Sequence, residues 1–181
     1  MLGNSARLVR FMITISLLIF SAISGISENK EILSTTVTLK EKVFNYNFSI
    51  RDNAGKQIAF EEFKGKVLFI NLWATWCGPC RFEMPTIQQL YSEVDHDQIK
   101  FIMLSLDKEK TVGNVPGYLK SNGYTFPVYH PAGFLPEQLQ VPYIPTTFII
   151  SKEGKIVAKE VGGINFNTPK FKKLLKEEAA K

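Results

Sequence analysis

Two cysteines, Cys77 and Cys80, stand two residues apart at the point where one sequence pattern gives way to another. Residues 67–73 are apolar at almost every position, which is typical of a central parallel strand buried on both faces. Beyond the cysteines, apolar side chains recur at the spacing of one helix face, at Ile87, Leu90, Tyr91 and Val94. The sequence therefore predicts that the cysteines lie where a buried strand ends and a helix begins.

The predicted position of the two cysteines favours redox chemistry. The thiolate is the nucleophile in disulfide exchange, and a helix N-terminus stabilises negative charge through its free N–H groups and its dipole. We expect Cys77 at the helix start, with its sulfur exposed, as the attacking group, and Cys80 one turn on, facing inward, as the resolving group. A bridge between them closes a very small loop and stabilises little, so chemistry explains the pair better than stapling does.

The remaining patterns indicate an α/β domain over residues 43–181. A second apolar strand at 99–106 completes a strand–helix–strand unit, which implies a parallel pair. Further elements are predicted as hairpins at 46–60 and 146–161, a short helix from Pro116 to Gly123, a short strand at 127–129 and a last helix capped by Thr168. Together they predict a central mixed β-sheet flanked by helices.

The N-terminal segment 1–27 has the features of a targeting signal. Arg7 and Arg10 form a basic region, and residues 11–26 form an apolar run shorter than the ~20 residues of a comfortable membrane span. Small residues at Ala22 and Ser24 suit a cleavage site. We interpret 1–27 as a signal peptide or a signal anchor, and 28–42 as a polar spacer with one short strand around 37–39. Either form predicts an extracytoplasmic domain, exported or held by a membrane anchor.

The charge of the chain argues against nucleic acid as a partner. The formal net charge is +5, and two of these charges, Arg7 and Arg10, belong to the targeting segment. The Lys-rich C-terminal tail also contains Glu177 and Glu178, as expected for a solvated helix face.

Residues 69–81, with Trp76-Cys77-Gly78-Pro79-Cys80 at their centre, resemble thioredoxin. Three further features are similar to the TlpA/ResA-like branch of thioredoxin-fold thiol–disulfide oxidoreductases: a hairpin ending in Phe63-Lys64-Gly65-Lys66, the run Glu83-Met84-Pro85, and Ile144-Pro145-Thr146 before an apolar strand. The similarity extends from about Phe48 to the C-terminus. It implies a thioredoxin-like fold with an N-terminal hairpin extension and a redox-active Cys77–Cys80 disulfide.

The resemblance also implies roles for residues around the cysteines. Pro145 is expected to follow a cis peptide bond facing Cys77, which turns the backbone of Ile144 outward to pair with an extended substrate strand. Glu83 is expected to manage protons around Cys80, the alternative being a first-turn glutamate that only favours the helix N-terminus. Trp76 is predicted to be a partly exposed substrate platform beside the sulfurs.

Asn71 departs from thioredoxin, in which a buried aspartate occupies the matching strand position and takes part in proton transfer. Asparagine cannot take up a proton at ordinary pH, so thioredoxin's mechanism is not transferred whole. The substitution favours Glu83 as the local acid–base group.

The predicted function is therefore reduction of protein disulfides outside the cytoplasm, with apocytochrome c thiols among the clients that the resemblance suggests. Electrons would come from a membrane thiol donor, since no G-x-G-x-x-G turn opens the strand–helix–strand unit and no cofactor or metal is predicted. Two alternatives stay open. A peroxiredoxin-like peroxidase shares the N-terminal hairpin, and a copper-binding thioredoxin-fold protein would use His130, although such proteins normally have a wider cysteine spacing.

Overall fold

The computed structural model describes residues 43–181. The predicted signal segment 1–27, the spacer 28–42 and its short strand at 37–39 lie outside the described residues. Along residues 43–181, no helix combines the length and the apolar character needed to cross a membrane.

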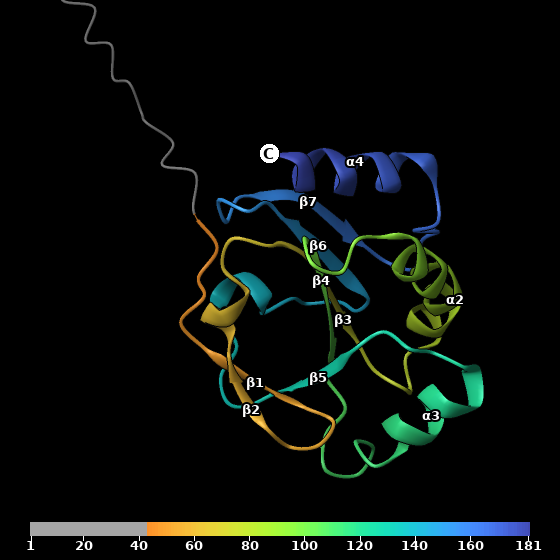
Figure 1. Cartoon of the computed structure of the whole chain (residues 1–181). Coiled ribbons are helices and arrows are strands. Elements are labelled where there is room, and N and C mark those ends of the chain that lie inside the picture. Colours follow the sequence, from red (N-terminus) through yellow and green to blue (C-terminus); the bar gives the residue numbers. More distant parts are fainter. Residues whose placement is uncertain (1–42) are drawn as a thin grey trace, which may run out of the picture. The chain divides into compact units, whose positions relative to one another are not determined.

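Residues 43–181 contain one mixed sheet of seven strands in the order β2-β1-β5-β4-β3-β6-β7 (Figure 1). The pairs β3–β4 and β4–β5 are parallel, and the other neighbouring pairs are antiparallel. The predicted mixed sheet and its central parallel pair are therefore confirmed. The strands are β1 (Ser49–Asp52), β2 (Gln57–Ala59), β3 (Val67–Trp73), β4 (Ile99–Ser105), β5 (Val128–Pro131), β6 (Thr146–Ile150) and β7 (Ile156–Val161).

Three α-helices and two short 3-10 helices flank this sheet within the described residues. The helix α2 follows β3 after a short turn, as predicted, and places the two cysteines at the strand–helix junction. The helical bounds are α2 (Gly78–Glu93), α3 (Asn114–Asn122), α4 (Pro169–Ala180), η1 (Phe60–Phe63) and η2 (Glu137–Leu139).

Two element boundaries differ from the sequence prediction. The helix α3 begins at Asn114 and not at Pro116, because the Asn114 and Val115 N–H groups already bond to carbonyls of the preceding turn. Proline in the first helical turn costs no hydrogen bond, so it did not mark the start. The strand β5 reaches Pro131 because it pairs with β4 at one end and with β1 at the other.

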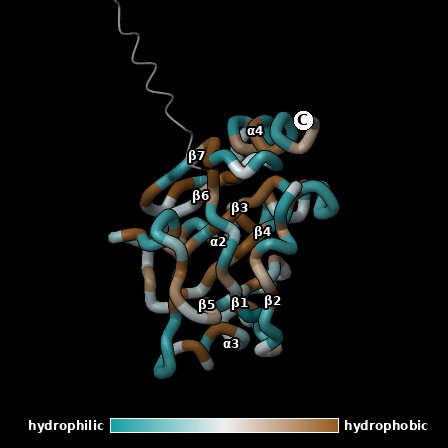
Figure 2. Tube along the Cα trace, turned by 90° about the vertical axis from the view of Figure 1, so that its left-hand side faces the viewer, coloured by the Kyte–Doolittle hydropathy of each residue, from teal (hydrophilic) through white to brown (hydrophobic). Residues whose placement is uncertain are grey.

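The core follows the two-residue period of the central strand. Side chains at 67, 69 and 73 of β3 belong to one buried cluster, with residues of α2, α3 and α4, and those at 68, 70 and 72 belong to a second cluster, with residues of η1, η2 and the N-terminal segment. Both faces of β3 are fully buried, and Figure 2 shows apolar stretches along the central strands. The run at 67–73 is thus apolar because neither face meets water.

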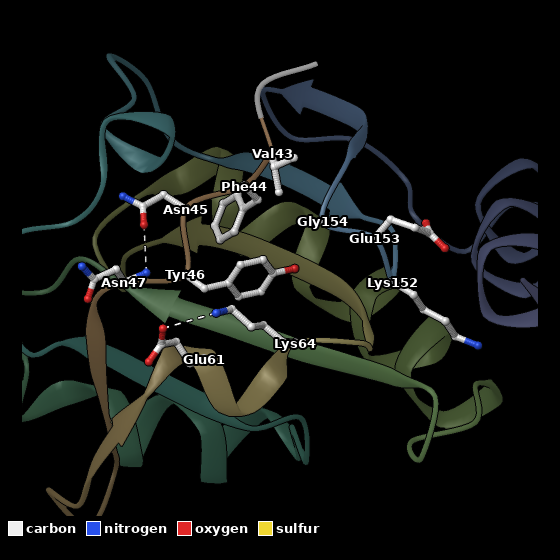
Figure 3. Close-up of a pocket in the computed structure, with 10 residues that line it drawn as sticks. All are labelled: Val43, Phe44, Asn45, Tyr46, Asn47, Glu61, Lys64, Lys152, Glu153 and Gly154. Carbon is white, nitrogen blue, oxygen red and sulfur yellow. Dashed lines mark hydrogen bonds and ion pairs between the residues drawn. The ribbon is translucent and has the colours of Figure 1, made fainter. Parts of the chain in front are cut away.

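The chain enters the domain through two buried aromatic residues, Phe44 and Tyr46 (Figure 3). Their rings meet edge to face at 5.2 Å, and the Phe44 N–H donates to the Gly154 carbonyl over 2.8 Å. A surface cavity of about 420 Å³ lies here, lined by Val43, Phe44, Asn45, Tyr46, Asn47, Glu61, Lys64, Lys152, Glu153 and Gly154. No residue predicted to act in redox chemistry lines this cavity.

Candidate active site

The two cysteines form a disulfide at the start of α2. The Cα atoms of Cys77 and Cys80 are 5.3 Å apart, and Cys77 is the N-cap residue of the helix, followed by Pro79 in its first turn. The Cys80 N–H donates toward the Cys77 sulfur over 3.2 Å. A free N–H of the first helical turn thus points at Cys77, which is the arrangement that stabilises a thiolate once the disulfide is reduced.

The exposure expected for the Cys77 sulfur is wrong for this disulfide form. Cys77 retains 5% of its accessible surface and Cys80 none, so both cysteines are buried, although Cys77 is the more accessible. The loop before β6 contributes to this cover, since the Ile144 carbonyl oxygen lies 3.7 Å from the Cys77 sulfur. A sequence pattern places a residue at a helix start, but it does not show what a distant loop brings over it.

The loop that faces Cys77 contains the expected cis peptide bond between Ile144 and Pro145. The Thr146 hydroxyl donates to the Tyr143 carbonyl over 2.7 Å, and the Gly162 N–H donates to the Pro145 carbonyl over 2.8 Å. These two bonds hold the turn at residues 143–146 beside the disulfide. Its proximity to Cys77 is observed, and pairing of Ile144 with a substrate strand stays a prediction.

Glu83 is fully buried in α2, three residues after Cys80 in the sequence. Its carboxylate accepts a hydrogen bond from Asn71 Nδ2 over 2.7 Å and a longer one from the Ile164 N–H over 3.3 Å. Burial raises the pKa of Glu83 to about 7, and these two bonds oppose part of the rise. The alternative role as a first-turn glutamate is wrong, because the first turn of α2 contains no acidic residue.

Asn71 connects Glu83 to the strand β6. It lies opposite Thr147 in the β3–β6 ladder, and its Nδ2 also donates to the Thr147 hydroxyl over 2.8 Å. Its Oδ1 is buried and has no hydrogen-bond partner among the described residues. Asn71 thus donates one hydrogen bond to a carboxylate and one to a hydroxyl, a role that an ionised aspartate at this position would not fill.

The aromatic residues near the site divide as predicted into buried and exposed. Trp73 is fully buried, whereas Trp76, directly before Cys77, is 62% exposed. Phe82 and Tyr143 are also exposed, and neither was singled out from the sequence. The signal for both was available, since each aromatic directly precedes a motif residue, Phe82 before Glu83 and Tyr143 before Ile144. The use of Trp76 as a substrate platform stays a prediction.

The Gly162-Gly163 pair follows β7, and Gly163 lies against the first turn of α2. A Cβ atom at Gly163 would lie 2.6 Å from the Pro79 carbonyl oxygen, so only glycine lets this loop approach the start of α2 so closely. The approach brings the Ile164 N–H to Glu83 and the Phe166 N–H to the Thr86 hydroxyl, the latter over 3.0 Å. Sequence reasoning missed these contacts, and a double glycine was their only signal.

The two histidines take no part in this site. His96 is exposed and its ring lies 4.2 Å from that of Tyr91, while His130 Nε2 lies 3.0 Å from Asn53 Oδ1. Within residues 43–181, no group of three or more His, Cys, Asp or Glu side chains is placed to hold a metal ion.

The family is decided by sequence comparison over most of the described domain. The model of the AhpC/TSA family matches residues 42–159. The chain belongs to this family. Within it, the chain is similar to the thiol–disulfide oxidoreductase ResA of Bacillus cereus (strain ZK / E33L), at 37% identity over 117 residues, which are 64% of this chain and 66% of that relative. The chain thus matches slightly less than two thirds of that relative's length.

A second relative matches a longer part of both chains. The ResA protein of Halalkalibacterium halodurans is 30% identical over 135 residues, 74% of this chain and 76% of its own length. The sequence-based resemblance is confirmed, and this AhpC/TSA chain is ResA-like in sequence.

Solved structures agree on the fold. StoA from Bacillus subtilis is 27% identical with a TM-score of 0.56, and the match covers 72% of this chain and 94% of StoA. A thiol:disulfide interchange protein of the thioredoxin family from Chlorobium tepidum TLS is 26% identical with a TM-score of 0.59, covering 76% and 96% of the two chains. The predicted thioredoxin-like fold is confirmed.

Proposed function

We propose that this ResA-like chain reduces protein disulfides outside the cytoplasm, using Cys77 and Cys80 as its dithiol. The observation that carries the proposal is the Cys77–Cys80 disulfide at the start of α2, with the Cys80 N–H 3.2 Å from the Cys77 sulfur. A cysteine pair at a helix N-terminus favours the thiolate and therefore rapid disulfide exchange.

The proposed cycle begins from the reduced protein. The Cys77 thiolate attacks one sulfur of a client disulfide, forms a mixed disulfide and expels the other client sulfur as a thiolate, which takes up a proton. The Cys80 thiolate then attacks the Cys77 sulfur, which restores the Cys77–Cys80 disulfide and releases the second client thiol. Overall, the client gains the two electrons and two protons that the reduced dithiol loses, the Cys77 proton having passed to solvent when its thiolate formed. A membrane thiol donor would return them.

Glu83 is proposed to move the proton that this cycle requires at Cys80. A carboxyl with a pKa of about 7, raised by burial, can both accept and release a proton near neutral pH. Glu83 follows Cys80 by three residues in α2, a spacing that puts both side chains on one helix face. Trp76, Ile144 and Pro145 are proposed to bind the client chain beside the sulfurs.

The proposed location and clients rest on the sequence. The basic and apolar segment at 1–27 supports export or anchoring at the outer face of the cytoplasmic membrane. Clients are proposed to be exported proteins with disulfides, including apocytochrome c whose thiols must be free for haem attachment.

The roles of the two cysteines are tested by trapping. Cys80→Ala removes the resolving thiol, so it should accumulate mixed disulfides with clients, which are visible on non-reducing gels and collapse on reduction. Cys77→Ala should trap none. Equal trapping by both variants would overturn the assignment of attacking and resolving cysteines.

Two activity measurements separate this proposal from its alternatives. A peroxidase would consume peroxide in the presence of a thiol reductant. A copper protein would bind copper tightly and would lose that binding in His130→Ala. We expect no peroxide turnover, because the reactive cysteine of a peroxiredoxin does not sit in a Trp-Cys-Gly-Pro-Cys turn such as the one that carries the Cys77–Cys80 disulfide. We expect no tight copper binding, because within residues 43–181 no group of three or more His, Cys, Asp or Glu side chains is placed to hold a metal ion. Tight copper binding that depends on His130 would displace disulfide reduction as the main function.

A further inference from the structure

A buried aspartate lies at the base of the turn that carries Cys77. Asp107 is 7% exposed and follows the end of β4. Its carboxylate accepts hydrogen bonds from the Thr75 N–H over 2.8 Å, from the Thr75 hydroxyl over 2.6 Å and from the Ser105 hydroxyl over 2.9 Å. None of these three residues has a role in the chemistry proposed above.

The parallel pairing of β3 and β4 explains why these residues meet. Trp73 and Ser105 are partners at the ends of the two strands, and the Leu106 N–H donates to the Trp73 carbonyl over 2.7 Å. The segments that follow the two strands therefore start side by side at the carboxyl ends of β3 and β4. Functional residues of parallel sheets gather at these ends. One of these segments runs directly into Cys77.

Thr75 sits inside the turn that delivers Cys77 to the helix. The Cys77 N–H donates to the Ala74 carbonyl over 3.1 Å, which closes the turn around Thr75 and Trp76. Asp107 binds both the backbone and the side chain of Thr75, so it fixes the position and the rotation of this residue at once. Charge-assisted hydrogen bonds of this kind are stronger than neutral ones.

We propose that Asp107 is a positioning residue for Cys77, acting through Thr75 to hold the turn before α2 in the geometry that brings Cys77 against Cys80. The inference rests on the proposed function, since it concerns the same dithiol. Asp107 does not touch the sulfurs in this role. It reduces the freedom of the turn, which raises the effective concentration of one thiol at the other.

The consequence is a preference for the closed disulfide and fast attack by Cys77. When the anchor is lost, the turn explores more conformations. Ring closure then becomes less favourable, and the midpoint potential of the couple becomes less negative. The Cys77 thiolate also spends less time beside the Cys80 N–H that stabilises it, so its attack on a disulfide slows.

The test compares Thr75→Val with Thr75→Ser in the otherwise unchanged chain. Valine keeps the branched shape and removes the hydroxyl that bonds to Asp107, whereas serine keeps the hydroxyl. Ser121→Ala, which removes an exposed hydroxyl bond within α3, is the control. Each reduced protein is mixed with oxidised glutathione to obtain the rate constant of attack, and equilibrated with dithiothreitol to obtain the equilibrium constant of the couple.

We expect Thr75→Val to slow attack by about tenfold and to weaken the disulfide by about tenfold, which corresponds to a shift of about 30 mV for two electrons. Thr75→Ser should recover most of both losses, and Ser121→Ala should match the parent. If Asp107→Ala folds, it should resemble Thr75→Val in both measurements. If it does not fold, the comparison of Thr75→Val with Thr75→Ser tests the role of Asp107.

The inference is overturned if Thr75→Val stays within about twofold of the parent in both measurements, or if Thr75→Ser is as impaired as Thr75→Val. Loss of thermal stability alone, without a change in rate or potential, would also contradict it, because it would make Asp107 a purely structural residue. A parent protein that fails to react with oxidised glutathione would instead contradict the proposed function.

Discussion

Asn71 donates a hydrogen bond to Glu83 over 2.7 Å, within the fully buried space between β3 and α2. The bond stabilises the ionised carboxylate, whereas burial opposes ionisation more strongly and raises the pKa to about 7. The carboxyl next to the disulfide-bearing helical turn is therefore balanced between its two protonation states near neutral pH.

The first prediction concerns the pH dependence of stability. The pKa of Glu83 is about 7 in the folded protein, raised by burial from its ordinary 4.5. At a pH below 4.5, the ordinary pKa, the carboxyl is mostly neutral in both the folded and the unfolded chain. As the pH rises from there to about 7, the unfolded chain ionises first, so the free energy of unfolding falls by on the order of 3 kcal/mol.

Glu83→Gln should remove this fall, because an amide does not titrate. Urea unfolding at intervals across the same pH range measures it, and the slope against pH is compared rather than the absolute stability. An exposed matched variant, Glu62→Gln, should keep the slope of the parent. A Glu83→Gln variant whose stability still falls like that of the parent would refute the assignment.

The second prediction separates the two partners of the Asn71 amide. Asn71→Leu keeps the site filled and dry but removes the donor, so the pKa of Glu83 should rise above about 7. Thr147→Val removes only the other acceptor of Asn71 and should leave that pKa near its parent value. The Glu83 carboxyl signal in a carbon-detected NMR titration reports both, and a lower value in Asn71→Leu would contradict the role given to the bond.

The third prediction concerns the loop after β7. Gly163→Ala places a methyl group 2.6 Å from the Pro79 carbonyl oxygen, where backbone must move on one side or the other. We expect a loss of about 1–3 kcal/mol in the free energy of unfolding, as for other overpacked sites. Gly117→Ala in α3 meets open space and should be neutral or slightly stabilising. Equal effects of the two substitutions would mean that the close approach is not real.

The fold was predictable from sequence where local pattern and burial agree. The run at 67–73 is apolar because β3 has two covered faces, and the helical period after Cys80 is that of the face of α2 turned to the core. The start of α3 was predicted wrongly at Pro116. Proline is tolerated anywhere in the first helical turn, where its missing N–H costs no hydrogen bond, so it does not mark the first residue of the helix.

The site was predictable only in its sequence-local part. Cys77, Cys80 and the cis bond before Pro145 came from motifs, but the burial of Cys77 depends on a loop 67 residues away. The partners of Glu83 come from β3 and from the segment after β7, and Thr75 meets Asp107 across two strand ends. Such contacts are set by the topology of the sheet, and a single sequence contains no period or spacing that reports them.

The midpoint potential of the Cys77–Cys80 couple tests the proposed reductase most directly. The protein is equilibrated against thiol buffers of known potential, and the reduced fraction is counted by thiol alkylation. A reductant that donates electrons to client disulfides should have a value below about −230 mV, near that of thioredoxin. A value near about −120 mV would identify an oxidant that makes disulfides, and would contradict the proposed reduction of exported proteins.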